Sequence, residues 1–147
     1  MTTQSTIHRQ PNTEVETKAW AQIGLVAAVV SIVAVLLAQA LALALWPDIA
    51  LFKPLDSYTR SALFVLVPAL GATGVFIWLA QRTQQPISKF ITISAIVLLA
   101  SIIPDYVIPD PNKTLLASTV TAFLHVVAGV ITMALLIIGY QRQTKQK

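Results

Sequence analysis

The chain has 147 residues, of which 56% are hydrophobic and only 11% are charged, and its mean hydropathy is +0.74. Soluble domains carry about 25% charged residues, so this composition excludes a water-soluble globular fold and predicts an integral membrane protein. The absence of cysteine excludes disulfides, thiol catalysis and cysteine-bound metals. The net charge of +4 comes from Lys and Arg in short segments between apolar runs, which indicates membrane topology and not a nucleic-acid partner.

Four long uncharged runs follow a polar N-terminal segment. Residues 1–18 are polar, so we expect a disordered cytoplasmic tail. A helix needs about 20 apolar residues to cross a bilayer. Three runs are long enough, and the remaining one is long enough only if it continues through Asp105 to Ile108. The predicted transmembrane domain covers residues 19–141, with spans at residues 20–46, 61–80, 90–108 and 115–140, before a basic cytoplasmic tail at 142–147.

Short connections with prolines separate the predicted spans. Such connections force sequential helices to run antiparallel, so the expected fold is an all-α, up-down-up-down four-helix bundle. In the last connection, Asp110 or Asn112 is expected to cap the fourth helix. Residues 38–40 read Ala-Gln-Ala, which leaves signal-peptidase cleavage as an alternative. The apolar run before them is longer than the usual signal region of about 7 to 15 residues, so we expect the first span to be retained.

The distribution of Lys and Arg predicts the orientation. The predicted cytoplasmic side has seven such residues: Arg9, Lys18, Arg82, Lys89, Arg142, Lys145 and Lys147. The other side has three: Lys53, Arg60 and Lys113. Cytoplasmic loops carry the excess of positive charge, so both termini are expected in the cytoplasm.

Small residues recur at helical spacing in the spans and predict seams where helices approach closely. The predicted seam of the first span consists of Gly24, Ala27, Ser31, Ala34 and Ala38. In the second span, Gly71 and Gly74 follow Pro68 in a similar strip. We favour packing within one four-helix bundle, with a dimer seam on the first helix as the alternative.

His125 is the main candidate for a functional residue. It lies about eleven residues into the last span, roughly 15 Å from the end of the helix and therefore near the bilayer midplane. Asp105 ends the third span, where it shares a helical face with Ser101. Together with Gln39 and Thr121, these residues are expected to line an outward-facing polar pocket. The structural alternatives are a neutral histidine that fixes helix packing and a carboxylate that ends its helix in water.

The sequence has neither a catalytic set nor enough ligands for a metal site, so we expect no enzyme, metal or cofactor. The segments Ser101-Ile-Ile-Pro104-Asp105 and Phe123-Leu124-His125 resemble an uncharacterised family of small four-helix bacterial membrane proteins. This resemblance implies a multi-pass architecture in the bacterial plasma membrane and no established activity. Small multidrug transporters share the plan, but they depend on a carboxylate in the first span, which is missing here.

The sequence therefore favours a structural or interaction component, whose partners are the bilayer and either a second copy or another membrane protein. The alternative is a small-solute or proton-coupled transporter that uses Asp105 and His125.

Overall fold

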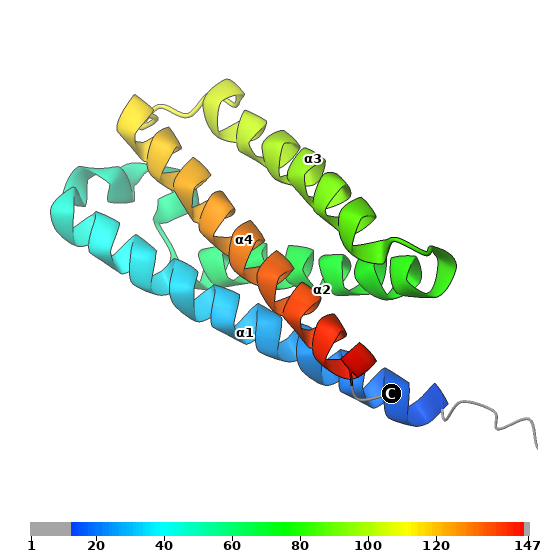
Figure 1. Cartoon of the computed structure of the whole chain (residues 1–147). Helices are drawn as coiled ribbons and strands as arrows, with labels where there is room; N and C mark the ends of the chain where they lie inside the picture. The colour runs from blue at the N-terminus through cyan, green and yellow to red at the C-terminus, as the bar shows by residue number, and fades with distance from the viewer. Residues whose placement is uncertain (1–12, 146–147) are drawn as a thin grey trace, which may run out of the picture.

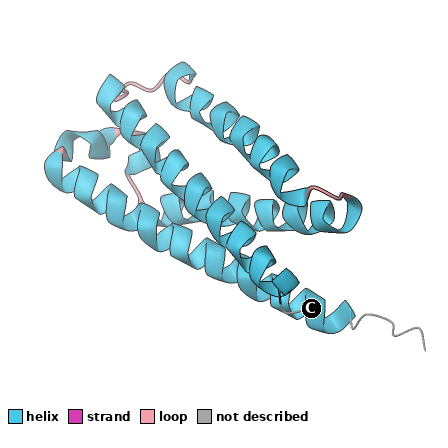
Figure 2. Ribbon diagram, viewed as in Figure 1, coloured by secondary structure: helices cyan, strands magenta, loops and turns pink. Residues whose placement is uncertain are grey.

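A computed structural model describes residues 13–145, and this part of the chain is all-α, without strands (Figures 1 and 2). The four long helices are α1 (Thr13–Leu45), α2 (Tyr58–Arg82), α3 (Pro86–Val107) and α4 (Leu115–Lys145). Two short 3-10 helices, η1 (Pro47–Leu51) and η2 (Lys53–Leu55), lie between α1 and α2. All four long helices are long and apolar enough to cross a membrane, which confirms the all-α class and the four candidate spans.

All four long helices extend beyond the predicted spans at one end or both; α2, for example, runs from Tyr58 to Arg82 where the prediction was 61–80. Residues 13–18 belong to α1 and are helical, although the sequence places them in a disordered tail; residues 1–12 of that tail lie outside the described residues. Helix α4 continues to Lys145, and α3 begins at Pro86, where proline occupies the first helical turn and its missing N–H is not needed. The differences arise because a helix need not end where its apolar run ends.

The helix caps correct one prediction. The backbone N–H of Ala117 donates to the Thr114 hydroxyl at 3.1 Å, so Thr114 caps α4. Asp110 instead accepts a hydrogen bond from the backbone N–H of Asn112 at 2.8 Å, which closes the turn before the helix. The N-cap of α2 is Ser57, whose hydroxyl accepts from the backbone N–H of Arg60.

The helices pack around two hydrophobic clusters, one at each end of the bundle. The cap cluster joins the residues Val35, Ala42, Ile49, Phe52, Leu55, Val65, Ala117, Val120 and Leu124. The tail cluster is built on Ala27, Phe76, Leu79, Phe90 and Leu136. We call the corresponding ends of the molecule the cap end, where η1 and η2 lie, and the tail end.

At the tail end, aromatic rings from all four helices meet. The Phe76 ring is 4.6 Å from that of Phe90, 5.5 Å from that of Tyr140 and 5.7 Å from that of Trp20, all edge to face between centroids. Tyr140 also stacks on Trp20 at 6.0 Å. Such pairs add about 0.5 to 1.5 kcal/mol each beyond simple burial, so this end is firmly joined.

Helix α1 lies beside α4, with α2 packed against it on another side (Figure 1). A Cβ built at Gly24 would lie 2.5 Å from Cγ2 of Thr73, so this glycine permits the close approach of α1 to α2. The hydroxyls of Ser31 and Thr132 hydrogen bond at 2.8 Å between α1 and α4. Ala27 is buried beside them, while Ala34 and Ala38 are half-buried.

The small residues of α2 are placed differently. Gly71 and Gly74 are exposed, and a Cβ at either position would meet no atom within 4 Å. The buried face of α2 instead consists of Ser61, Val65, Ala69, Thr73, Phe76 and Leu79. The seam expected at these two glycines is therefore not formed between helices of this chain, because they lie on the side of α2 that faces away from the bundle.

Candidate functional site

Asp105 lies in the last turn and a half of α3, at the cap end, and is 8% exposed. Its Oδ2 atom is buried, and no group in the described part of the chain hydrogen bonds to it. The residue four positions later is Pro109, which has no N–H to donate to the backbone carbonyl of Asp105. The hydroxyl of Ser118 in α4 donates to that carbonyl at 2.7 Å. Ser118 therefore holds the backbone of α3 against α4 at the position of Asp105.

His125 faces Asp105 from α4. Its Nδ1 atom lies 2.9 Å from the backbone carbonyl of Thr121, and because a carbonyl can only accept, Nδ1 carries a proton. The same Nδ1 lies 3.5 Å from Oδ2 of Asp105. The side chains differ in burial, since that of His125 is 34% exposed and that of Asp105 is 9% exposed. The two candidates from the third and fourth spans thus meet across the α3–α4 interface.

Thr121 and Ser101 contribute less to this pair than their positions in the sequence suggest. The Thr121 hydroxyl donates to the Ala117 carbonyl at 3.0 Å, within its own helix, so this residue contacts the pair only through its backbone carbonyl. The Ser101 hydroxyl donates to the Leu98 carbonyl at 2.7 Å, also within its own helix. Both hydroxyls are hydrogen-bonded to backbone carbonyls of their own helices, as is common for Ser and Thr inside helices.

Gln39 has a different role. It is fully buried, and its Nε2 donates to the Leu55 carbonyl at 3.1 Å, which ties α1 to η2. Its Oε1 is buried and has no hydrogen-bond partner in the described residues. Sequence reasoning placed Gln39 in a common pocket with Asp105 and His125, whereas its amide donor is used to hold the cap segment.

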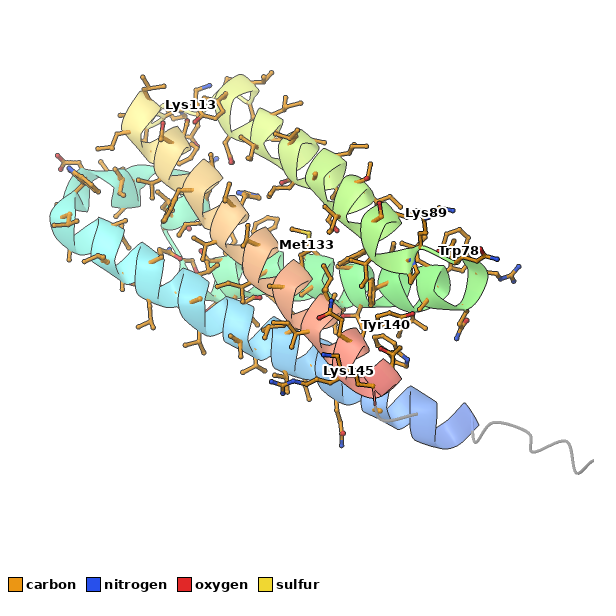
Figure 3. The ribbon with its side chains drawn as sticks, viewed as in Figure 1. Trp78, Lys89, Lys113, Met133, Tyr140 and Lys145 are labelled. Atoms are coloured by element: carbon orange, nitrogen blue, oxygen red, sulfur yellow. The ribbon has the colours of Figure 1, made fainter. Side chains whose placement is uncertain are left out.

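The C-terminus of α3 carries a second attachment near Asp105. The ammonium group of Lys113, labelled in Figure 3, donates to the backbone carbonyls of Tyr106 at 3.1 Å and Ile108 at 3.0 Å. A cation at the carboxyl end of a helix complements the helix dipole. Sequence reasoning missed Lys113 and Ser118 as partners of α3, although Pro109 signals that the Asp105 carbonyl needs a donor from outside the helix.

Because Nδ1 of His125 already carries a proton, the pair can take up one further proton, either on the Asp105 carboxylate or on the second ring nitrogen of His125. Metal binding has no comparable support, since the described residues contain no group of three or more His, Asp or Glu side chains that could hold an ion. No family model, curated protein or solved structure matches this chain. The resemblance to the uncharacterised four-helix family therefore stays a prediction, and any function has to be argued from the site.

Proposed function

We propose that this protein is a proton-coupled transporter of a small solute, in which Asp105 and His125 form the proton-binding site. The observation that carries the proposal is the buried, unpartnered Oδ2 of Asp105, 3.5 Å from Nδ1 of His125 within helices apolar enough to cross a membrane. Ionisable side chains in such segments are rare because they are costly there, and they commonly belong to proton relays and substrate pathways.

The energetic argument rests on charge. An isolated carboxylate at the centre of a membrane span costs about 2.5 to 3.5 kcal/mol on insertion scales, and the cost is smaller in the last turn of a span, where Asp105 lies. A proton on either Asp105 or His125 leaves the pair without net charge, because the carboxylate is then neutral or faces an imidazolium. Loss of that proton leaves one uncompensated negative charge at the α3–α4 interface. Proton binding and the local structure are therefore coupled, as a transporter requires.

The proposed orientation places the cap end outside and both termini in the cytoplasm of a bacterial plasma membrane. It is supported by the seven Lys and Arg residues on the side of the termini against three on the other. An up-down-up-down path agrees with the packing of the two ends of α1 on α4, where Trp20 stacks on Tyr140 and Ala42 joins Ala117 in the cap cluster. In this orientation the pair receives protons from the external side.

The test is pH-dependent infrared difference spectroscopy of the purified protein in lipid. All carboxylates of the chain contribute carboxylic-acid bands on acidification, and Asp105→Asn should remove the component that comes from the buried Asp105. The matched control is Asp110→Asn, a carboxylate in the adjacent turn, which should keep that component. If Asp105→Asn retains the full signal, Asp105 does not bind protons and the proposal fails.

Coupling to a solute needs a second measurement. Proteoliposomes adsorbed on a solid-supported membrane should give a transient current after a pH jump in the wild type and in Asp110→Asn, and none in Asp105→Asn. Small amines, acids and sugars are then applied one at a time as concentration jumps at constant pH. At least one of these solutes should give a current in the wild type and in Asp110→Asn but not in Asp105→Asn. If no solute gives a current in any of the three proteins while the infrared signal of Asp105 is intact, solute transport is contradicted and only proton binding remains.

The second candidate function is a structural or interaction component, and one observation favours it. Gly71 and Gly74 form an exposed strip on α2 that no described part of the chain covers. Strips of small residues let membrane helices associate closely. A second copy or another membrane protein is the partner expected in this case, and Asp105 would then have no pH-dependent signal.

A further inference from the structure

Helix α3 is held differently from the other three. Only three of its 22 residues are buried, namely Pro86 and Phe90 near its start and Asp105 near its end. In α4, by contrast, seven of 31 residues are buried, and they are spread from Ala117 to Leu136. Between its two ends α3 touches the bundle mainly through half-buried side chains such as Leu98, which packs over Gly129 of α4. Figure 1 shows α3 at the edge of the bundle.

The two attachments of α3 differ in chemistry. At the tail end, the Phe90 ring packs on Phe76 and belongs to the apolar tail cluster, which does not respond to pH. At the cap end, Asp105 makes two contacts with α4: its backbone carbonyl accepts from Ser118, and its side chain faces His125. The Tyr106 hydroxyl adds a hydrogen bond to Thr119 of α4 at 3.3 Å, on the exposed side of the interface. The cap-end attachment therefore includes a buried group that can change charge, while the tail-end attachment does not.

We propose that α3 is the moving element of this protein: it pivots at Phe90 and separates from α4 at its cap end when the Asp105–His125 pair loses its proton. The proposal rests on the proposed function, since it requires that the pair binds protons. An uncompensated carboxylate is hydrated if the cap end of α3 opens, whereas in the closed state it stays buried against α4. The device couples proton release to access from the cap end, which is the regulation that a transporter of this size needs.

The distribution of ionisable residues around Asp105 supports the assignment of the Asp105–His125 pair as the pH-sensitive contact of α3. From Ala19 to Leu45, α1 has no ionisable residue. The ionisable residues of α2, of the rest of α3 and of the last connection are Tyr58, Arg60, Arg82, Lys89, Tyr106, Asp110 and Lys113. Arg60 pairs with Asp56 at 2.6 Å, and Lys113 donates to backbone carbonyls of α3. Within the described residues, His125 is the one basic side chain at ion-pair distance from Asp105.

The test is a pair of distance measurements between spin labels on cysteines introduced into this cysteine-free chain, with the protein in lipid. The cap-end pair joins Ile103→Cys in α3 to Leu41→Cys in α1, and the tail-end pair joins Ile91→Cys in α3 to Val26→Cys in α1; all four native side chains are exposed. Raising the pH should lengthen the cap-end distance and leave the tail-end distance unchanged. With Asp105→Asn added, the cap-end distance should stay short at every pH, because the amide is neutral.

Ser118 provides a second variant that does not alter the charge. Ser118→Ala removes the hydrogen bond to the Asp105 carbonyl and should increase the long-distance population at every pH. The matched control is Ser61→Ala, because the buried Ser61 hydroxyl donates to the Ser57 carbonyl of the same segment, at 3.2 Å, and joins no other helix. It should leave the distances unchanged.

The infrared spectrum shows whether Asp105 binds protons. If it does, but the cap-end distance does not respond to pH, the proposed movement of α3 is wrong and the proton site stands. Equal lengthening of both pairs would mean a general loosening of the bundle and would also overturn the pivot. If Asp105 gives no infrared signal, the proposed function itself has failed, so the two failures are distinguishable.

Discussion

At the scale of single residues, the glycines of the spans separate into two environments. A Cβ at Gly24 would lie 2.5 Å from Thr73, whereas at Gly74 it would meet nothing within 4 Å. Gly24→Ala should therefore lower the stability of the bundle by about 1 to 3 kcal/mol, because α1 and α2 are forced apart. Gly74→Ala should be neutral or stabilising by up to about 1 kcal/mol, because alanine is the better helix former.

Thermal unfolding of both variants in the same detergent checks this prediction. Equal destabilisation by the two substitutions would contradict it, and would indicate that the exposed strip of α2 packs against another molecule.

The residue scale also indicates how far the sequence could predict the site. Asp105 and His125 stand out in the sequence because an ionisable residue in an apolar span is rare, and both are expected in one polar pocket, but the sequence does not predict how close the two side chains lie. The structure places Nδ1 3.5 Å from Oδ2 because both side chains point across the interface. The sequence did not predict the hydrogen bond from Ser118 to α3. Its acceptor is the backbone carbonyl of Asp105, which has no helical donor because of Pro109, and side-chain patterns do not reveal a backbone acceptor.

At the scale of elements, the cap segment with η1 and η2 is the part that the sequence predicted least. It was expected as a connection, yet Ile49, Phe52 and Leu55 are buried in it and pack on α1, α2 and α4. Helical periodicity does not reveal how a short loop with prolines folds back. For the same reason Gln39 was assigned to a polar pocket, although it bonds to this segment.

Gln39→Leu tests the function of that contact. It removes the donor to the Leu55 carbonyl while keeping much of the side-chain volume, so η1 and η2 should loosen. Hydrogen exchange of the backbone amides of residues 47–57 should accelerate about threefold to tenfold, which corresponds to a hydrogen bond worth about 0.5 to 1.5 kcal/mol. Gln141→Leu, on the exposed end of α4, serves as the control. Unchanged exchange in Gln39→Leu would show that the apolar contacts of the segment hold it without the amide.

At the scale of the whole molecule, four apolar helices were predictable because length and hydropathy are additive along the chain. Which helix faces pair could not be predicted, because small residues occur both at helix contacts and on lipid-facing surfaces.

The orientation is open to a direct experiment on the cysteine-free chain. In vesicles of known sidedness, a membrane-impermeant maleimide should label Asn112→Cys from the external side and Thr144→Cys only after permeabilisation. The reverse pattern would invert the proposed orientation and expose the pair to cytoplasmic protons.

The most direct measurement of the Asp105–His125 pair is nitrogen NMR of the His125 ring in lipid, as a function of pH, in protein with His8→Gln so that one histidine reports. The ring signals should respond to pH as the charge of Asp105 changes, and Asp105→Asn should alter that response, because the carboxylate 3.5 Å away is replaced by a neutral amide. Asp110→Asn should leave it as in the wild type. His125 ring signals that do not respond to pH and are unchanged by Asp105→Asn would contradict proton binding by the pair and leave it a structural contact between α3 and α4.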